Sequence, residues 1–431
     1  MQFLITNVKV LDPNASESYE ADVLLRGDQI ARVDKRWLKP SVVSNDTRIL
    51  ETHGAYLAPA FWDLHVHARE PGQEHKETLA TAALAAAHGG VGRFFAMPNT
   101  EPAIDNVKTL RWVLDRAKAQ EHLADIEFIG AVTKKRAGKT LADLTAMRES
   151  GAVAFSDDGN PVSNPKILKR ALELTASFDS FVIDHAEIPK LSRGGAMHEG
   201  ALSRKLKLPG IPSQAEFAAV AQDIEILKKT KGRLHIAHVS TKESVDLIRK
   251  AKKNGLSGRL TCEVCPHHFS LTDEVVGKFG SLAKVNPPLR EREDVLALLE
   301  AIADGTVDAI ASDHAPHAKR EKDLAMIKAP FGMIGMETMF SLAITHLVRP
   351  GVIPLARAIY LLTAGPAKVV GRKSPSIEPG EPANLVLFDP AARTSFRRFV
   401  SKSQNSPFLG ATLYGKVLAT IHRGQVVYNA F

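Results

Sequence analysis

Several features are scarce in this chain, and each absence excludes a class of protein. Its 431 residues include two cysteines, so a disulfide framework cannot form. No run of about 18 apolar residues suggests a membrane span. Residues 1–8 lack a basic leader followed by a long apolar core, so we expect no signal peptide. These absences favour a cytoplasmic protein with a large apolar core.

Clustered positive charge is also missing. The formal net charge of +8 is a mild excess for this length, and the basic residues are scattered along the chain. We therefore expect no nucleic-acid partner, although a basic field suits an anionic small substrate. Cys262 and Cys265 form a CxxC motif on a predicted strand, where positions three apart face opposite sides. This spacing favours two buried thiols over a redox pair or a shared metal site.

The two ends of the chain predict the same kind of structure. Short strands separated by Asp, Pro, Asn and Gly turns are predicted at residues 3–10, 21–25, 29–33, 383–388, 411–418 and 425–428. We expect residues 1–57 and 370–431 to pair into one small domain of the β-sandwich type.

The central part, residues 58–369, follows a different pattern, in which apolar strands alternate with amphipathic helices. The strand candidates lie at residues 57–64, 91–97, 126–132, 152–156, 181–184, 233–239, 260–264 and 308–312. Eight strand–helix units over about 300 residues predict an α/β fold of the (β/α)8 TIM-barrel type. This barrel would be the catalytic domain.

Two helices carry clear start signals. Ser213 with Glu216 forms a predicted capping box, and the helix would bury Phe217, Val220, Ile224 and Leu227 before it ends at Gly232. A second helix is predicted to open at Ser240 with Glu243, and Gly255 lies past its end.

Metal-ligand residues recur where the predicted strands end. His65 and His67 lie one residue apart at the end of an apolar run, so on a strand both project from one face. His185, His238 and Asp313 end other strands, and the carboxyl ends of barrel strands meet on one rim. Together these side chains form the mixed nitrogen and oxygen set that zinc prefers. Either Asp157 or Asp158 could add a carboxylate, and the sequence alone does not choose between them.

Other candidates are set aside. His235 is offset from His238 by an odd number of residues, so we interpret it as a packing or surface residue. His267, His268 and His314 are interpreted as residues held by the backbone or by neighbouring groups. Residues 130–140 end like a phosphate-binding loop, but their glycines are eight apart instead of five. We interpret this basic stretch as a solvated loop.

At this point the chain resembles the amidohydrolase superfamily, and most closely the class I bacterial dihydroorotases. The matching pieces, in the order of that family, are DLHVHAREPG at 63–72, MPNT at 97–100, SDDG at 156–159, AHVSTKES at 237–244, CPHH at 265–268, VNPPLR at 285–290, SDHAPH at 312–317 and PFG at 330–332. They cover nearly the whole chain.

The resemblance implies a role for each site residue. His65, His67 and Asp313 would hold one zinc ion, and His185 and His238 would hold a second. Many relatives bridge the two ions with a carbamylated lysine, whereas here Asp158 stands at that place, as in the class I enzymes. One or two zinc ions per chain are therefore expected. Substrate would be bound by Arg69, Asn99, Asn286 and His317, with Phe331 and Gly332 closing on the ring.

The reaction implied is the reversible ring closure of N-carbamoyl-L-aspartate to L-dihydroorotate in de novo pyrimidine biosynthesis. Asp313 would act as general base and then as general acid. Arg69 would grip the free carboxylate of the substrate through its two-pronged guanidinium. An allantoinase or hydantoinase is the alternative enzyme, but these generally lack Arg69 and use the lysine carbamate.

A catalytically silent subunit that scaffolds aspartate transcarbamoylase is the alternative from another class. Silent relatives usually lose metal histidines, and every expected histidine is present here. Aspartate transcarbamoylase remains an expected partner because class I enzymes can require it for activity. A homodimer is a further expected assembly.

Overall fold

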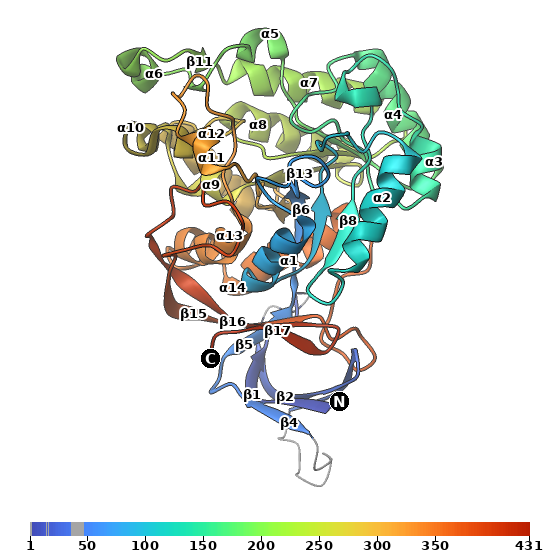
Figure 1. Cartoon of the computed structure of the whole chain (residues 1–431), viewed down its shortest axis with the longest axis vertical. Coiled ribbons are helices and arrows are strands. Elements are labelled where there is room, and N and C mark those ends of the chain that lie inside the picture. Colours follow the sequence, from blue (N-terminus) through green and yellow to red (C-terminus); the bar gives the residue numbers. More distant parts are fainter. Residues whose placement is uncertain (1, 14, 16, 36–46) are drawn as a thin grey trace.

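The structure is a computed structural model that describes residues 2–13, 15, 17–35 and 47–431. Strands from both ends of the chain form one eight-stranded sheet, the terminal sheet, at the bottom of Figure 1. Its order is β17-β16-β15-β5-β1-β2-β3, and β4 pairs with β1. The strands are β1 (Gln2–Val10), β2 (Tyr19–Arg26), β3 (Gln29–Asp34), β4 (Arg48–Glu51), β5 (Tyr56–Pro59), β15 (Leu385–Ser395), β16 (Thr412–His422) and β17 (Gln425–Asn429).

The terminal sheet has an apolar core of its own. Ile5, Val23, Leu57 and Ile421 lie in this core, and each is fully buried. The two ends of the chain meet where β15 pairs antiparallel with β5, and Gln29 forms a further bridge to Pro382. The six strands predicted near the chain ends are confirmed.

The central part contains parallel strands in two further sheets. Their orders are β6-β7-β8 and β14-β13-β12-β9, and a separate pair joins β10 to β11. Isolated parallel bridges connect Phe155 to both Gly130 and Val182, and Val66 to His314. The bounds are β6 (Phe61–Val66), β7 (Val91–Ala96), β8 (Asp125–Phe128), β9 (Val182–Asp184), β10 (Met197–His198), β11 (Gly210–Ile211), β12 (Leu234–Ile236), β13 (Leu260–Val264) and β14 (Ala309–Ile310).

Two strand predictions in the central part need correction. The predicted strand at 57–64 is two strands, because the chain leaves the terminal sheet after Pro59 and enters the parallel sheet at Phe61. Ala60 marks the change, since its N–H donates to Asn384 and the next N–H donates to Gly90. Residues 152–156 form no continuous strand and bridge only at Phe155, although the N–H groups of Val153 and Phe155 donate to the carbonyls of Phe128 and Phe181 on either side.

Helices surround these parallel strands (Figure 1). They are α1 (Leu79–His88), α2 (Val107–Lys118), α3 (Leu144–Glu149), α4 (Pro165–Ser177), α5 (Pro189–Ser192), α6 (Ala201–Leu206), α7 (Gln214–Lys228), α8 (Lys242–Ala251), α9 (Pro266–Ser270), α10 (Val276–Phe279), α11 (Arg292–Ala303), α12 (Lys319–Lys322), α13 (Met336–Ala343), α14 (Leu355–Leu362) and α15 (Ala364–Val369). None of the helices among the described residues is long and apolar enough to span a membrane.

The predicted helix starts are wrong in their details. Ser213 precedes α7, but its side chain caps nothing. Glu216 instead accepts hydrogen bonds from the backbone N–H groups of Ser240 and Thr241, each at 3.0 Å. Thr241, not Ser240, caps α8 by accepting from the N–H of Ser244. The carboxylate of Glu216 therefore holds the turn between β12 and α8. The sequence pattern instead predicts that Glu216 forms a capping box with Ser213 at the start of its own helix.

Aromatic rings join the terminal sheet to the central part. Phe388 of β15 stacks on Tyr56 with 5.7 Å between ring centroids, and it meets Phe340 of α13 edge to face at 4.9 Å. Phe340 in turn stacks on Phe61 of β6 at 5.2 Å. Phe61, Phe340 and Phe388 are fully buried, so this aromatic junction is part of the main apolar core.

Candidate metal centre and carboxylate pocket

Four histidines and two aspartates from separate segments of the central part meet in one cluster. His65 ends β6, His185 follows β9, and His238 follows β12. The Nε2 atoms of His65 and His238 lie 3.3 and 3.4 Å from Asp158 Oδ1. His67 Nε2 lies 3.1 Å from Asp313 Oδ1. His185 Nδ1 lies 2.9 Å from His238 Nε2 and 3.6 Å from Asp158 Oδ1, so Asp158 occupies the middle of the cluster.

The cluster has the composition of a cation site. All six residues are at most 5% exposed, and burying two carboxylates this close together is costly without a compensating positive charge. Two groups, His65–His67–Asp313 and His65–Asp158–His238, each have ligand atoms within 4.8 Å of one another. His65 Nε2 and Asp158 Oδ1 are buried and accept or donate no hydrogen bond. These residues could therefore hold one or two divalent cations.

Asp157 has a different position from its neighbour. Its carboxylate accepts the N–H of Thr133 at 3.0 Å and also the hydroxyl of the same residue. Burial raises the pKa of Asp157 to about 6. The geometry thus separates two adjacent aspartates that the sequence left equivalent, because Asp158 contacts the histidines and Asp157 does not.

A chain of hydrogen bonds between buried groups orients His65. Its Nδ1–H donates to Glu263 Oε1 at 2.8 Å, which leaves Nε2 directed at Asp158. The other oxygen of Glu263 lies 3.1 Å from His235 Nε2, and His235 Nδ1 lies 2.8 Å from the Thr261 hydroxyl. Burial tends to raise the pKa of Glu263, but the bonds from His235 and His65 lower it to about 2. His235 therefore supports the cluster through Glu263; it is fully buried, so the surface alternative is wrong, and packing alone does not describe its role.

The loops after the strands are held in backbone conformations that L-residues rarely adopt. Arg69, His238 and Asp313 have φ angles of 64°, 33° and 46°. Such conformations persist only where the surroundings fix them, and they gather at functional sites. Asp63 supplies part of that constraint, because its Oδ1 accepts the N–H of Ser312 at 2.9 Å and so ties β6 to the loop of Asp313.

Beside the metal cluster lies a small cavity of about 210 Å³. Its lining combines five of the six cluster residues with all six residues expected to bind substrate, namely Arg69, Asn99, Asn286, His317, Phe331 and Gly332. His65 is fully buried behind this lining. We name the part of the cavity formed by these six residues the carboxylate pocket.

Arg69 is the cation of the carboxylate pocket. Its Nε–H donates to the Pro316 carbonyl at 3.1 Å, and one terminal nitrogen lies 3.2 Å from His317 Nε2. Burial lowers the pKa of Arg69 to about 10, with Asp313 opposing the shift, so the guanidinium is charged at neutral pH. Burial and the charge of Arg69 lower the pKa of His317 to about 2, so this imidazole is neutral.

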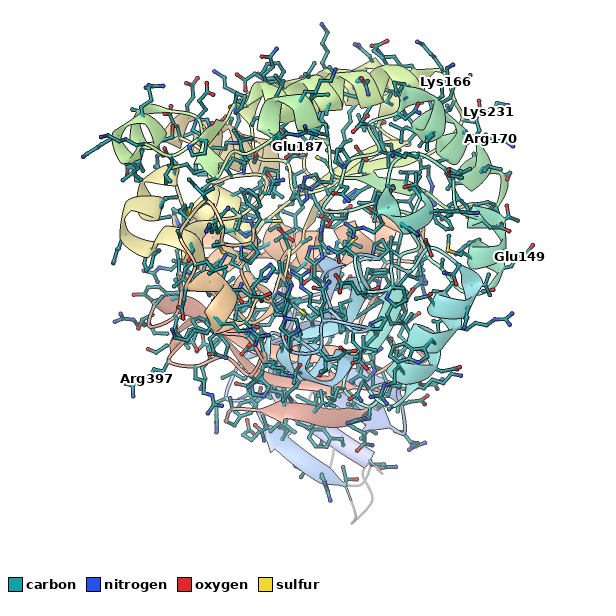
Figure 2. All side chains as sticks on the ribbon, turned by 45° about the horizontal axis from the view of Figure 1, so that its top comes forward. Glu149, Lys166, Arg170, Glu187, Lys231 and Arg397 are labelled. Atoms are coloured by element: carbon teal, nitrogen blue, oxygen red, sulfur yellow. The ribbon has the colours of Figure 1, made fainter. Side chains whose placement is uncertain are left out.

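The two asparagines connect the carboxylate pocket to the metal cluster. Asn99 Oδ1 lies 2.9 Å from His67 Nδ1. Asn286 Nδ2 donates to Glu187 Oε2 at 2.8 Å and lies 3.1 Å from His185 Nε2. Glu187 was not among the expected site residues. In Figure 2 it lies toward the middle of the view, whereas Lys166, Lys231 and Arg397 lie at the edge.

The structure confirms the interpretation of the two cysteines and of two histidines outside the cluster, and it corrects part of the interpretation of the basic loop. The basic stretch is solvated at Lys134, Lys135 and Lys139, as interpreted, but the half-buried Arg136 donates from its guanidinium to the carbonyl of Asp158 at 2.8 Å. His314 and His268 lie outside the cluster, held by Glu77 at 3.3 Å and by the Pro287 carbonyl at 2.9 Å. Both cysteines are free and buried, as expected. Cys265 lies near His267 and His268, with ligand atoms within 4.8 Å of one another.

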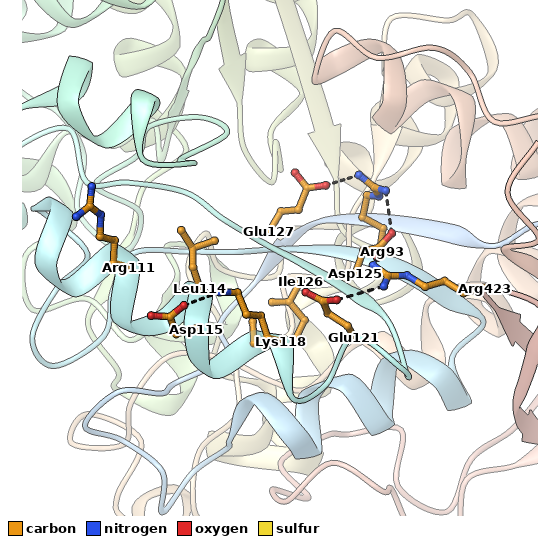
Figure 3. A pocket seen from close by; sticks show the side chains of 11 residues that line it. Arg93, Arg111, Leu114, Asp115, Lys118, Glu121, Asp125, Ile126, Glu127 and Arg423 are labelled. Carbon is orange, nitrogen blue, oxygen red and sulfur yellow. Dashed lines mark hydrogen bonds and ion pairs between the residues drawn. The ribbon is translucent and has the colours of Figure 1, made fainter. Parts of the chain in front are cut away.

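A larger hollow of about 490 Å³ lies elsewhere, between α2, β8 and the turn at Arg423 (Figure 3). Its charged groups neutralise one another. Arg93 and Arg423 pair with Asp125 at 2.8 and 2.9 Å, and Arg423 also pairs with Glu121 at 3.2 Å. Because these cations are already paired, the hollow offers less to an anionic ligand than the carboxylate pocket does.

Comparisons with known proteins agree with this geometry. Residues 54–244 match the family model described as dihydro-orotase-like. Dihydroorotase from Pelotomaculum thermopropionicum is 44% identical over 99% of this chain and 98% of its own, and that from Acetivibrio thermocellus is 41% identical over 98% of both. Dihydroorotase from Endomicrobium trichonymphae is 40% identical over the full length of both chains.

Solved structures match the fold. The L-hydantoinase from Arthrobacter aurescens superposes with a TM-score of 0.86 at 23% identity, covering 99% of this chain and 96% of its own. The dihydropyrimidinase from Brevibacillus agri gives 0.83 at 22% identity, covering 100% and 95%. At these identities the likeness concerns the fold alone, whereas the sequence relatives match over the whole length at 40% identity or more. The chain therefore belongs to the dihydroorotase family.

Proposed function

We propose that this chain is a zinc-dependent class I dihydroorotase, which interconverts N-carbamoyl-L-aspartate and L-dihydroorotate. One observation carries the proposal: a buried arginine lies in the same cavity as a cluster of four histidines and two aspartates. The cluster suits hydrolysis of an amide, and Arg69 suits a substrate with a free carboxylate. A hydantoin ring carries no such carboxylate, so Arg69 favours dihydroorotate over the hydantoinase alternative.

The fold that we propose is a (β/α)8 TIM-type barrel with a small β-sandwich domain. The bridges of Phe155 and of Val66 to His314 support closure of the parallel strands into one barrel. The bridge from Gln29 to Pro382 supports folding of the terminal sheet over its own core. Residues 58–369 would form the barrel, and residues 1–57 with 370–431 would form the smaller domain.

The donor set assigns the metal ligands in this proposal. His65, His67 and Asp313 would hold one zinc ion, His185 and His238 would hold a second, and Asp158 would bridge them. Bound zinc lowers the pKa of a water molecule and polarises a carbonyl group. A bridging aspartate is shorter than a lysine carbamate, so occupancy of the second position is expected to depend on conditions.

The protein's own residues would bind the substrate and move one proton. Arg69, with Asn99, Asn286 and His317, would fix the substrate carboxylate, so that attack on the ring carbonyl is effectively unimolecular. Phe331 and Gly332 would close on the ring. Asp313 would take a proton from the attacking water and deliver it to the departing ring nitrogen, and ring closure would reverse both transfers.

We further propose a cytoplasmic role in de novo pyrimidine biosynthesis, with the small substrate as the main partner and no nucleic-acid or membrane partner. The family of the sequence relatives supports this role. Aspartate transcarbamoylase and a second copy of the chain stay predicted partners. Size-exclusion chromatography with and without aspartate transcarbamoylase tests both.

The proposed function is tested by metal analysis of the purified protein, combined with assays on dihydroorotate, hydantoin and allantoin. We expect the purified protein to contain zinc and to turn over dihydroorotate but neither hydantoin nor allantoin. Chelation should abolish this turnover, and added zinc should restore it. Turnover of hydantoin or allantoin in preference to dihydroorotate would identify a different cyclic amidase. Bound zinc without any turnover, also in the presence of aspartate transcarbamoylase, would favour the silent scaffold.

A further inference from the structure

A segment near the end of the chain packs against the loops of the carboxylate pocket. Residues 399–406, here named the strap, connect β15 to β16 without regular secondary structure. Ser401, Ser403, Asn405 and Ser406 of the strap are between 1 and 4% exposed. Polar side chains buried to this degree in an irregular segment need hydrogen-bond partners to offset their loss of hydration.

The first part of the strap contacts the loop that follows Arg69. The Ser401 hydroxyl and the Lys402 N–H donate to the carboxylate of Glu77, the latter at 3.1 Å. The Ser403 hydroxyl donates to the Lys76 carbonyl at 2.7 Å. These bonds fix where the strap lies along the rim of the site.

Asn405 contacts two other loops of the carboxylate pocket through every polar group of its side chain. Its Oδ1 accepts the N–H of His317 at 3.0 Å. Its Nδ2 donates to the carbonyls of Ala315 at 3.0 Å and Gly332 at 3.1 Å. Its own carbonyl accepts the N–H of Ile334 at 3.0 Å. One carboxamide therefore bridges the loop before α12 and the loop before α13.

These contacts determine where the substrate-binding groups stand. Residues 315 and 317 flank Pro316, whose carbonyl accepts the Nε–H of Arg69. The two loops are also pressed together at Gly332, where an added Cβ would lie 2.6 Å from Ala315 Cβ. A shift of the Asn405 carboxamide would therefore move Arg69, His317 and the backbone at Gly332 together.

We propose that Asn405 is the positioning residue of the carboxylate pocket. This inference rests on the proposed function, because it assigns Asn405 to the binding of the substrate carboxylate. Asn405 does not line the cavity, and the hydrogen bonds of its side chain go to the backbone of Ala315, His317 and Gly332. Asn405 acts on the pocket through the Pro316 carbonyl, which accepts the Nε–H of Arg69, and through the backbone of His317 and Gly332.

The Asn405→Asp variant tests the inference with the smallest change in shape. It keeps an acceptor for the N–H of His317, but it places a carboxylate oxygen against the carbonyls of Ala315 and Gly332. We expect KM for dihydroorotate to rise about tenfold or more while kcat stays within about threefold, since binding is lost equally in the ground and transition states. Zinc content should not change.

Ser406→Ala is the matched control. Ser406 neighbours Asn405 and is similarly buried, but its hydroxyl accepts only the N–H of Phe408 at 3.2 Å, in the same connection between β15 and β16. Its KM should equal that of the unmodified protein. An unchanged KM in Asn405→Asp, or equal losses of kcat in both variants, would overturn the positioning role. Should Asn405→Asp not fold, Asn405→Ser removes the same donors without adding charge and is expected to give the same rise in KM.

Calorimetric titration with orotate separates this inference from the proposed function. Orotate carries the same carboxylate on an unsaturated ring, so its binding reports on the carboxylate pocket without turnover. We expect orotate to bind about tenfold more weakly to Asn405→Asp than to the unmodified protein or to Ser406→Ala. If the unmodified protein binds orotate but turns over no dihydroorotate, the proposed function fails while this comparison still decides the role of Asn405.

Discussion

At the scale of single residues, a lysine cannot reproduce the geometry of the Arg69 guanidinium. The planar guanidinium donates to the Pro316 carbonyl through Nε, places a second nitrogen 3.2 Å from His317 Nε2 and still faces the cavity. We predict that Arg69→Lys raises KM for dihydroorotate by about 10- to 100-fold, because one two-pronged ionic contact is lost. Steady-state kinetics measures the change. A KM within twofold of the original value would mean that the substrate carboxylate binds elsewhere.

The proton-transfer role of Asp313 is a second prediction at this scale. Burial opposes ionisation of Asp313, but the hydrogen bond from His67 and the nearby histidines hold its pKa below the ordinary range, so it is a carboxylate at neutral pH. We predict that Asp313→Asn lowers kcat by at least about 100-fold with no loss of fold, as judged by circular dichroism. Asp157→Asn is the control, because Asp157 is a buried neighbour of the cluster that bonds Thr133 instead. Near-normal turnover by Asp313→Asn would rule out this base.

The sequence predicted which residue types gather at the site better than it predicted how they are held. Strand ends predicted that His65, His67, His185, His238 and Asp313 meet at one site, since that needs only the period of a strand and the geometry of parallel strands. Arg69 was implied by the family resemblance. Asp157 and Asp158 could not be separated, because adjacent residues differ only in which way the turn directs them. His235 was misjudged because its partner, Glu263, lies on the neighbouring strand, and no spacing within one segment reveals that contact.

At the scale of elements, the short helix α12 buries a charged side chain beneath the carboxylate pocket. Lys322 is 4% exposed, and its ammonium group donates to the carbonyls of Pro330 and Gly332, each at 2.9 Å. Burial and the nearby Lys284 lower the pKa of Lys322 to about 7. The carbonyls hold the ammonium group without a carboxylate in direct contact, so this lysine loses its proton far more readily than one in water.

This arrangement predicts a dependence of stability on pH. Between the folded pKa of about 7 and the ordinary value of 10.5, the unfolded chain binds a proton at Lys322 that the folded chain does not. Lys322 should therefore make the free energy of unfolding rise with pH over that range. Urea unfolding at pH 7, 8, 9 and 10 measures how the free energy of unfolding changes with pH. This change should be smaller for Lys322→Met than for Lys319→Met. Lys319 is the control because it lies on the same helix and its side chain is 88% exposed. Equal slopes would contradict a depressed pKa.

Element boundaries were the least predictable part of the fold. The run at 57–64 is apolar throughout, so nothing in it marks the change of sheet at Ala60, which depends on pairing with Asn384 and Gly90. Residues 152–156 are as apolar as a strand, yet only Phe155 finds bridging partners. The spacing of Ser213 and Glu216 fits a capping box, but Glu216 bonds Ser240 and Thr241 more than 20 residues away. In each case a contact between distant segments outweighed the local pattern.

At the scale of the whole molecule, two of the contacts that join the terminal sheet to the central part differ sharply in burial. The Phe388 ring of the aromatic junction is fully buried, whereas the side chain of Arg423, which forms the ion pairs, is itself 49% exposed. Exposed ion pairs are screened by solvent and contribute little, while removal of a buried ring leaves a cavity. The two contacts can therefore be ranked.

We predict that Phe388→Ala lowers the free energy of unfolding by about 3–5 kcal/mol. Arg423→Ala should lower it by less than about 1 kcal/mol, with a smaller effect still at high salt. Urea unfolding of both variants at two salt concentrations measures the difference. A larger loss for Arg423→Ala would assign the connection to the ionic network of Figure 3 instead.

The position of the strap along the chain has a consequence for how the protein is made. A ribosome delivers the polypeptide from its N-terminus, so the barrel residues emerge long before Asn405 does. Until residue 405 has left the exit tunnel, the loops at 315 and 332 have only their direct contacts, such as the bond from the Ala315 N–H to the Met333 carbonyl, and lack the carboxamide that bonds both loops. The nascent chain would thus complete the segments that carry its histidines and aspartates before the contacts of Asn405 with the carboxylate pocket can form.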